Sequence, residues 1–570
     1  MIKLKGKIDF HPKFFSMMKN YTKEKFVADT MAGAIVAIVA ALPLAIAFAI
    51  ASGLSPAQGL ITSVIAGFII SLLGGSSVQI GGPTGAFIMV IYTVVLQFGL
   101  EGLVIATVLA GLILLFLGLF KLGTIIRFIP YPIIVGYTSG IAITIFSSQI
   151  RDLFGLNITT AIPSDFLSKW SVYFAHMNTM NIWSVAIGIA SILIIIFTPR
   201  FSKKIPGPLV AIIVLTLIAF VLRKYVGVSG IETIGDRFQL SAFFSFPGIP
   251  TLKMEMINKL LPYAFTIAVM GAIESLLSAT IADGATGDKH NSNTELIAQG
   301  IANIVVPFFG GMPATGAVAR TMTNISSGGK TPVSGMMHSL VLLLILLFLG
   351  SLTTHIPMAC LAGVLVIVSY NMSEWRSFRA LMRNSRSDIA ILWTTFLLTV
   401  IFDLTIAIEV GLLLAMLSFM KRINETTRIS VTKDKLDLSL EGEIYHGEEM
   451  LELSEGIEVF EIDGPFFFGI ANKFDECMKS IGDKPKVRII RMRKVPFMDT
   501  TGLHNLENLH RLSEREKIRM VLSGVNEEVY KVLKNSGFAE KVGKENICPN
   551  IKKAIERAEE CLKETESETL

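Results

Sequence analysis

A short run of small residues, Gly81-Gly82-Pro83-Thr84-Gly85-Ala86, recurs further along the chain as Gly310-Gly311-Met312-Pro313-Ala314-Thr315-Gly316-Ala317. The two threonines of these runs are 231 residues apart. Apolar segments that are interrupted by Gly and Pro at matching places in two halves of a chain are typical of transporter binding sites built from inverted repeats. Small residues also favour tight helix crossings, so a chance match between packed helices is the alternative interpretation.

The segments around these runs are apolar and have the length of membrane spans, about 20 residues or fewer where a helix is broken inside protein. Eleven clear candidates are 30–51, 57–73, 101–120, 128–150, 182–198, 207–222, 260–282, 333–352, 357–371, 388–402 and 404–420. Three weaker, Gly/Pro-interrupted candidates are 82–98, 294–309 and 314–327. Together they predict fourteen spans, with the two runs in the third and the tenth. Because seven is odd, two halves of seven spans have opposite orientation, which predicts a 7+7 inverted repeat.

The composition supports a membrane domain followed by a soluble one. The chain of 570 residues is 52% hydrophobic and only 17% charged, against about 25% charged in soluble domains. Residues 1–420 hold 26 Lys and Arg and 17 Asp and Glu, whereas residues 421–570 hold 25 and 29. Disorder, collagen-like repeats and a coiled coil are excluded by the apolar content. No stripe of basic and aromatic residues indicates a nucleic-acid partner.

The distribution of basic residues predicts the orientation of the spans. With the N-terminus inside, the inside segments carry 18 Lys and Arg and the outside loops carry 6, as the positive-inside rule requires. Both termini are therefore expected in the cytoplasm. Residues 1–29 contain seven lysines and no apolar core, so they are expected to be a cytoplasmic segment rather than a cleavable signal peptide. Residues 30–422 would form the transmembrane domain, 423–440 a polar linker, and 441–570 a cytoplasmic domain.

The charged tail has the pattern of a small α/β domain. Residues 458–462 and 487–492 alternate or cluster as strands, and residues 470–480, 501–514, 526–536 and 551–563 have the apolar spacing of helices. The four cysteines show no metal-ligand spacing, and three of them lie in the tail. We expect no metal site and no disulfide framework, in keeping with a reducing compartment.

Several stretches resemble the sulfate permease family, the bacterial relatives of solute carrier family 26, over almost the whole chain. In the membrane part they are Asp29-Thr-Met-Ala-Gly33, Pro43-Leu-Ala-Ile-Ala-Phe-Ala-Ile50, Gly82-Pro-Thr-Gly-Ala86, His290-Asn-Ser-Asn293 with Glu295-Leu296 and Gln299-Gly300, Gly328-Gly-Lys-Thr331, and Asp403-Leu-Thr-Ile-Ala407. The tail resembles the STAS domain at Asp463-Gly-Pro-Phe-Phe-Phe-Gly469 and Phe497-Met-Asp-Thr-Thr-Gly502.

The resemblance implies a homodimer in a bacterial inner membrane, with a core domain (spans 1–4 and 8–11) that moves like an elevator against a gate domain (spans 5–7 and 12–14). It implies secondary active transport of a small anion: sulfate first, then bicarbonate, then a dicarboxylate. The STAS domain would bind a cytoplasmic protein partner. Two other functions remain open, a nucleobase permease of the same inverted-repeat fold and a STAS-based sensor or scaffold. No nucleophile–base signature indicates an enzyme, and we expect no cofactor besides a coupling ion, H⁺ or Na⁺.

The two small-residue runs are the predicted anion site. Helices that begin near Thr84 and Thr315 would present free N–H groups and a partial positive charge to one ligand. The small neighbours Gly85, Ala86, Gly316 and Ala317 would let the backbone approach that ligand. Arg320 lies one turn into the tenth span, where a charge costs several kcal/mol, and would be an anion ligand or a source of positive field.

Glu274 is expected to carry the coupling ion, because it is the only carboxylate deep in a clear apolar segment. A desolvated glutamate could carry a proton, or it could bind Na⁺ together with the hydroxyls of Ser278 and Thr315. In some bacterial relatives an Asp with a hydroxyl residue four positions later serves a sodium site, and the pair Glu274 and Ser278 departs from that pattern. Proton-coupled symport is therefore preferred, and the alternative is a structural ion pair between Glu274 and Arg320.

Three further predictions concern single positions. Pro43 and Phe48 lie in the first span, where the family lines its pocket; Leu44 replaces a polar Gln of many relatives, and Phe48 could equally be core packing. Thr500 and Thr501 match a loop that is phosphorylated in the anti-sigma-factor antagonists, although an N-cap of the next helix is the simpler interpretation. Gly329-Lys330-Thr331 resembles the end of a P-loop but lacks its first glycine and its preceding strand.

Overall fold

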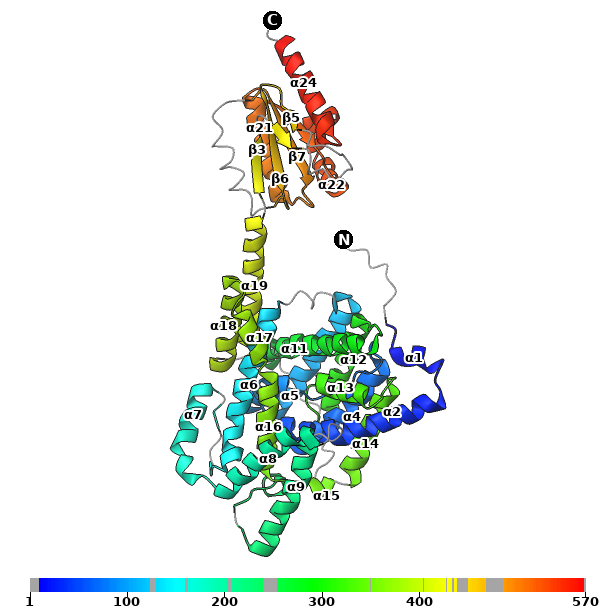
Figure 1. The fold of residues 1–570 in the computed structure, drawn as a ribbon, viewed down its shortest axis with the longest axis vertical. Coiled ribbons are helices and arrows are strands. Elements are labelled where there is room, and N and C mark those ends of the chain that lie inside the picture. The colour runs from blue at the N-terminus through cyan, green and yellow to red at the C-terminus, as the bar shows by residue number, and fades with distance from the viewer. Residues whose placement is uncertain are drawn as a thin grey trace. The chain divides into compact units, whose positions relative to one another are not determined.

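The computed structural model describes residues 10–123, 130–158, 162–163, 165–201, 207–228, 230–238, 254–348, 350–402, 404–426, 428–432, 435–437, 450–467 and 485–567. The chain divides into two compact units, Met1–Leu414 and Ala415–Leu570. The first unit is helical and the second contains a mixed sheet covered by helices (Figure 1).

The helices of the first unit pack in two groups. In the first group α5 packs on α11 and α12, α14 packs on α2 and α4, and α13 packs on α11. Its members are α2 (Lys23–Val36), α3 (Leu42–Ala51), α4 (Pro56–Leu73), α5 (Ile88–Leu119), α11 (Met254–Thr286), α12 (Ser292–Val305), α13 (Val318–Ser326) and α14 (Val333–Phe348). Close approach of these helices depends on small residues, since a side chain at Gly111 or Gly300 would press against the backbone of the partner helix.

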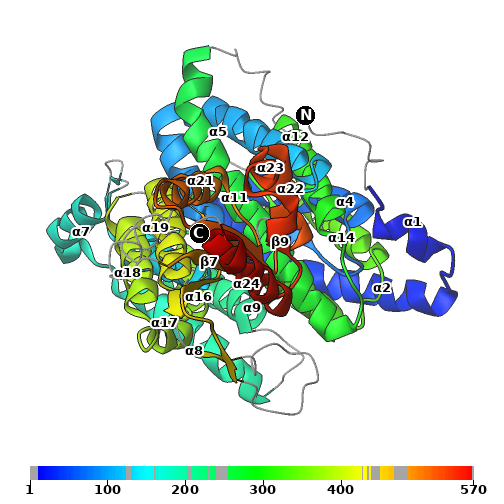
Figure 2. The same ribbon diagram turned by 90° about the horizontal axis from the view of Figure 1, so that it is seen from above.

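In the second group α6 packs on α16, α18 and α8, and α16 packs on α8 and α9. Its members are α6 (Tyr131–Phe154), α8 (Ile182–Phe201), α9 (Gly207–Val221), α16 (Met358–Met372) and α18 (Arg386–Ile401). Shorter helices accompany the two groups: α1 (Lys13–Met18), α7 (Phe166–Ala175), α10 (Ile234–Arg237), α15 (Gly350–Thr353) and α17 (Trp375–Leu381). Seen from above, α1 and α2 lie at one side of the first unit and α7 and α18 at the other (Figure 2).

Eight of the described helices are long and apolar enough to cross a membrane: Lys23–Ala51, Pro56–Leu73, Gly85–Leu119, Tyr131–Phe154, Ile182–Phe201, Gly207–Val226, Met254–Thr286 and Met358–Leu381. The segment Gly85–Leu119 combines the predicted spans 82–98 and 101–120. Its backbone breaks at Gly99, where φ is 67°, a conformation that glycine adopts without steric cost. Shorter helices, such as α13 and α14, occupy other predicted spans.

The second unit begins within α19 (Leu404–Thr426) and is built around a five-stranded sheet in the order β3-β6-β7-β8-β9. The strands are β3 (Arg428–Thr432), β6 (Ile457–Asp463), β7 (Val487–Lys494), β8 (Arg519–Ser523) and β9 (Ile547–Cys548). β3 is antiparallel to β6, and the remaining neighbours are parallel, with Phe460 opposite Ile490 and Ile490 opposite Leu522. A separate antiparallel pair joins β4 (Lys435–Asp437) to β5 (Met450–Glu452).

Helices bury both faces of this sheet, so its central strands β6 and β7 are buried along most of their length, and their buried charges Glu458 and Arg488 pair at 2.6 Å. On one face Phe460, Ile490 and Leu522 pack with residues of α21 (Thr500–Arg515), α22 (Glu527–Asn535) and α23 (Phe538–Val542). On the other face Val459 and Ile489 pack with the apolar stripe of α24 (Ile551–Ser567).

The structure agrees with most predicted elements of the tail and differs in one region. The strands predicted at 458–462 and 487–492 are β6 and β7, and the helices predicted at 501–514, 526–536 and 551–563 are α21, α22 and α24. Where a polar linker was expected at 423–440, the structure has the end of α19 and the strands β3 and β4, and β3 hydrogen-bonds to β6 as part of the sheet. The helix predicted at 470–480 lies outside the described residues.

Candidate functional site

The two small-residue runs meet in the interior of the first helix group. Residues Gly81–Gly82 form β1 and Thr315–Gly316 form β2, and the two pair antiparallel with Gly81 opposite Gly316 and Gly82 opposite Thr315. A further bond runs from Ala317 N to the carbonyl of Ile80 at 3.0 Å. A helix follows each strand: a short 3₁₀ turn, η2 (Gly85–Phe87), leads into α5, and α13 begins at Val318. The predicted anion-site residues Thr84, Gly85, Ala86, Thr315, Gly316 and Ala317 therefore lie in one region, and all are buried.

The pairing requires glycine because other groups approach the backbone closely. A Cβ at Gly82 would overlap the guanidinium of Arg320, and a Cβ at Gly316 would overlap the side-chain amide of Gln79. Both neighbours are held in place, since Gln79 Nε2 donates to Ser275 Oγ at 3.0 Å and Arg320 makes two bonds of its own. Any side chain at either glycine would have to displace a buried polar group.

Arg320 lies in the first turn of α13, directly behind the first run. Its side chain is 1% exposed, and it donates to Ser63 Oγ in α4 at 3.1 Å and to the carbonyl of Pro83 at 3.2 Å. Glu274 and Arg320 are both in the described part of the chain and form no ion pair there. The guanidinium thus places a positive charge next to Pro83 and Thr84. Among the described residues no carboxylate pairs with it.

Glu274 in α11 and Thr84 are neighbours, and each has a side-chain oxygen without a hydrogen-bond partner among the described residues. The Thr84 hydroxyl lies close enough to interact with the Glu274 carboxyl, yet Glu274 Oε2 and Thr84 Oγ1 are buried and have no well-oriented hydrogen-bond partner among the described residues. Phe48 is close by, because its Cε1 lies 3.5 Å from where a Cβ of Gly85 would be. Buried polar atoms normally have partners, so these two atoms mark a place where a proton, an ion or water can bind.

The other two hydroxyls of the predicted coupling site point to neighbours. Thr315 Oγ1 donates to the carbonyl of Gly271 at 2.7 Å, one turn before Glu274 on α11. Ser278 Oγ donates to Thr321 Oγ1 at 3.2 Å. The structure therefore brings Thr315 to the Glu274 helix and ties Ser278 to α13.

A buried polar network that the sequence analysis did not foresee surrounds the runs. Glu295 in α12 is fully buried, so Glu274 is not the only carboxylate at depth. Its Oε2 accepts from Gly75 N at 2.9 Å, and its Oε1 accepts from Gln299 Nε2 at 2.9 Å. Asn303 brackets the second run, accepting from Ala314 N at 2.9 Å and donating to the carbonyl of Ala314 at 2.8 Å. Glu295, Gln299 and Asn303 are spaced by four residues, a polar face that periodicity could have revealed.

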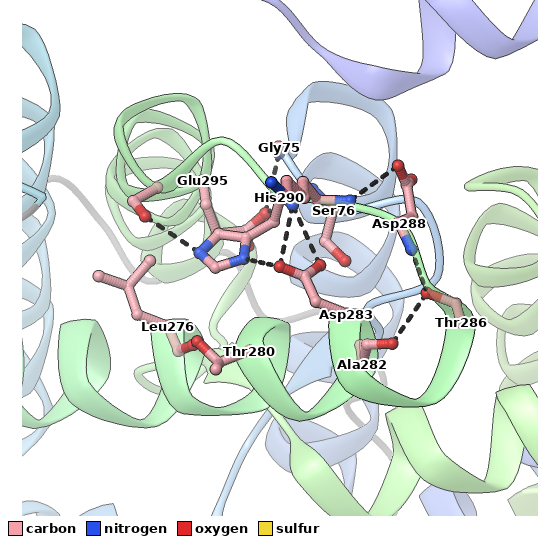
Figure 3. A network of polar contacts seen from close by, with 12 residues as sticks. Gly75, Ser76, Leu276, Thr280, Ala282, Asp283, Thr286, Asp288, His290 and Glu295 are labelled. Atoms are coloured by element: carbon pink, nitrogen blue, oxygen red, sulfur yellow. Dashed lines mark hydrogen bonds and ion pairs between the residues drawn. The ribbon is translucent and has the colours of Figure 1, made fainter.

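Further polar contacts fix the loops at one end of the first helix group. His290 Nδ1 lies 2.6 Å from Asp283 Oδ2, and His290 N also donates to this carboxylate at 3.0 Å (Figure 3). Lys13 Nζ pairs with Asp288 at 2.9 Å. These contacts give His290 a partner within the protein and connect α11 to the loop before α12.

Asp29 explains the stretch that resembles a P-loop. Its carboxylate is fully buried and accepts from Lys330 N at 2.7 Å, Thr331 N at 3.1 Å and the Thr331 hydroxyl at 2.5 Å. Tyr21 donates a fourth bond at 3.1 Å. The backbone N–H groups of this loop therefore bind a carboxylate of the protein, and the loop joins α2 to the connection between α13 and α14.

In the second unit Asp499 caps α21. Its Oδ1 accepts from Gly502 N at 2.7 Å, and α21 begins at Thr500. Thr500 is exposed and Thr501 is half-buried. The cap is thus made by Asp499, which leaves the Thr500 hydroxyl accessible.

These observations define a class: a polytopic helical membrane protein with two interrupted segments that meet inside a helix group, followed by an α/β domain. The model of the sulfate permease family matches residues 26–395, and the model of the STAS domain matches residues 450–554. The chain belongs to the sulfate permease family.

Individual relatives agree with this assignment. The chain is 39% identical over 541 residues, 94% of this chain and 98% of the relative, to the "Putative sulfate transporter YvdB" of Bacillus subtilis (strain 168). It is 31% identical over 494 residues, 84% of this chain and 85% of the relative, to the bicarbonate transporter BicA of Picosynechococcus sp.. Its fold matches murine Slc26a9, an anion transporter solved in the inward-facing state, with a TM-score of 0.83, 20% identity and coverage of 98% of this chain and 97% of that one.

Proposed function

We propose that this protein is a secondary active transporter of a small inorganic anion, sulfate first and bicarbonate next, with a dicarboxylate third. The observation that carries the proposal is the pairing of β1 with β2, which brings the starts of two helices together in front of the buried Arg320. The first turn of a helix has free N–H groups and a partial positive charge, and an anion between the two runs would use both. The names of the Bacillus and Picosynechococcus relatives support sulfate and bicarbonate.

We infer that Glu274 couples anion movement to protons. The unpartnered Glu274 Oε2 and Thr84 Oγ1 support this role, because a carboxyl that gains a proton can donate to its neighbour. A sodium site would need several free oxygen ligands. Ser278 and Thr315 donate their hydroxyl protons to Thr321 and Gly271, which leaves their oxygen lone pairs available, so the preference for the proton rests on the unpartnered Glu274 Oε2 and not on these hydroxyls. Phe48, beside Gly85, would line the pocket that the anion enters.

The proposed transport motion is an elevator-like displacement of the first helix group, as core domain, against the second group, as gate domain. The separate packing of the two groups supports it. We further propose fourteen spans arranged as a 7+7 inverted repeat, with both termini in the cytoplasm of a bacterial cell and a homodimer as the assembly. The basic residues counted above and the eight long apolar helices support this topology.

For the STAS domain we propose binding of a cytoplasmic protein partner, regulated by phosphate on Thr500 or Thr501. The accessible Thr500 at the start of α21 supports this role, since a phosphate there would meet the positive end of the helix. Membership of the sulfate permease family weighs against a nucleobase permease.

Uptake by the purified protein in proteoliposomes tests the transport proposal. Labelled sulfate, bicarbonate and succinate would be offered with and without an inward proton gradient, and with and without Na⁺. We expect accumulation driven by the proton gradient alone for at least one inorganic anion. Glu274→Gln mimics the protonated carboxyl and should keep anion exchange while losing accumulation. Glu255→Gln, an exposed acid at the start of the same helix, is the matched control and should behave as wild type.

Two outcomes would overturn this coupling. One is accumulation that persists in Glu274→Gln, and the other is wild-type uptake that needs Na⁺ and ignores the proton gradient. Absence of any anion uptake by a folded protein would overturn transport itself and favour the sensor or scaffold.

A further inference from the structure

A cavity of about 270 Å³ lies between the two helix groups, away from the paired runs. Its lining comes from the end of α3, the start of α5, the end of α6, and α7 and α10. Ile50 lies two residues beyond Phe48 on α3, and Met89 lies four residues beyond Gly85, so the helices that carry the proposed anion site also line this cavity. Three of the four charged residues in its lining are basic, Arg151, Lys169 and Arg237, and the fourth is Asp152.

One of the three cations is neutralised. Arg237 binds Asp152 Oδ1 at 2.7 Å and Glu232 Oε2 at 2.5 Å. Burial lowers the pKa of Arg237, but the two carboxylates outweigh this effect and raise it above its usual value. Arg237 therefore fixes the cavity wall and has little capacity left for a ligand.

Arg151 and Lys169 have donors to spare. Arg151 Nε is buried and has no hydrogen-bond partner among the residues that the structure describes. Lys169 lies on the buried face of α7 with 3% exposure, and its Nζ is 5.7 Å from the centre of the Tyr92 ring. Within the described ranges Lys169 forms no ion pair. A buried ammonium without a carboxylate or ligand is costly.

The surroundings of Lys169 support a need for an anion. Burial lowers the pKa of Lys169 to about 8, and the nearby Asp165 opposes this shift only in part. Asp165 is exposed and caps α7 by accepting from Ser168 N at 2.8 Å. The hydroxyl of Tyr92 from α5 donates to the carbonyl of Ile162 at 2.8 Å. Tyr173 from α7 and Arg151 from α6 line the same cavity. Lys169 therefore has the exposed Asp165 nearby and shares the cavity lining with two tyrosines, Asp152 and a second cation, Arg151.

We propose that Arg151 and Lys169 form a second anion site, an outer vestibule that captures a small oxyanion of the transported class before it reaches the paired runs. This proposal rests on the proposed transport function and names a site that precedes the central one. An oxyanion accepts bonds from both groups and also balances their positive charge, which a neutral ligand does not do. The cavity lies on the side where the predicted outside loops begin, so positive charge there would also concentrate anions from the medium.

Trp170 offers a direct readout of this cavity. It follows Lys169 in α7, donates Nε1 to Ser147 Oγ at 3.1 Å, and its ring lies 6.1 Å from that of Tyr173. The chain has four tryptophans, so the combined change of Trp183, Trp375 and Trp393 to Phe leaves one reporter. The full-length protein in detergent would be titrated with sodium sulfate, and separately with sodium bicarbonate, at constant ionic strength while Trp170 fluorescence is recorded.

We expect a saturable change that persists when Arg320→Ala disables the central site. Lys169→Gln and Arg151→Gln should each weaken the response roughly tenfold, as loss of a charged hydrogen bond predicts. Lys169→Arg keeps the charge and should retain binding. Lys259→Gln removes an exposed lysine at the start of α11 and is the matched control.

The proposal is overturned if no saturable change occurs, as a cavity that holds only water would give. It is also overturned if Lys169→Gln and Arg151→Gln bind sulfate and bicarbonate like wild type. Circular dichroism and size-exclusion profiles verify that the variants are folded. Failure of the two proposals can be told apart. Uptake without a Trp170 response overturns the vestibule alone, whereas a Trp170 response without uptake overturns transport.

Discussion

Replacing Arg320 by Ala should weaken anion binding strongly while leaving the protein folded. The guanidinium donates to the carbonyl of Pro83, so an anion on the N–H groups of Thr84 or Gly85 would lie one or two residues away. Two unit charges roughly 6–8 Å apart at an effective dielectric constant of about 20 interact by about 2–3 kcal/mol. For a singly charged anion this corresponds to about a 30- to 150-fold loss of affinity.

Stability should change much less, because two effects oppose each other. Ser63 Oγ and the Pro83 carbonyl lose a donor, which costs about 1–3 kcal/mol for each group. Removal of a fully buried cation recovers a desolvation penalty of several kcal/mol. Labelled-anion binding to the purified protein measures the affinity, and thermal unfolding monitors the fold. Arg320→Lys keeps the charge and should recover most of the affinity. Wild-type affinity in Arg320→Ala, or an unfolded Arg320→Ala protein, would refute this reasoning.

Three other perturbations test separate parts of the structure. Asp29→Ala removes the buried carboxylate that accepts four hydrogen bonds. It should lower the free energy of unfolding by about 3–5 kcal/mol, which a lower unfolding midpoint would show. An unchanged midpoint would contradict the anchoring role of Asp29. Gly316→Ala should abolish transport by displacing the Gln79 amide, whereas Gly284→Ala, which meets no atom within 4 Å, should transport normally. Sulfate binding at the Trp170 reporter should be constant below about pH 7 and fall as pH rises through about 8, where Lys169 loses its proton; a flat profile in that range would exclude Lys169 as a ligand.

The sequence alone predicted the meeting of the two small-residue runs, because close backbone approach leaves a direct trace in Gly and Ala. It also predicted β6, β7 and the helices α21, α22 and α24, whose apolar spacing is regular. The strand β3 was hidden because Arg428–Thr432 is short and polar enough to resemble a linker, and only its pairing with β6 makes it a strand.

The polar interior of the first helix group was harder to foresee. The four-residue spacing of Glu295, Gln299 and Asn303 is visible in the sequence, but the backbone N–H groups of Gly75 and Ser76 that bind Glu295 come from a distant part of the chain. No local pattern records such distant donors. Lys169 and Arg151 were counted as ordinary loop charges, because the apolar surroundings that bury Lys169 come from other helices.

The pairing of β1 with β2 also constrains how the chain can be synthesised. Gly82 pairs with Thr315, so the first strand lacks its partner until more than two hundred further residues have been added. At about 5–20 residues per second this delay lasts roughly 10–50 s. During this delay the backbone groups of β1 lack their partner strand, and unpaired backbone groups are costly inside a lipid bilayer. The backbone N–H and C=O groups of Gly81 and Gly82 that bond β2 in the folded protein must therefore be satisfied in another way until Thr315 and Gly316 have been added.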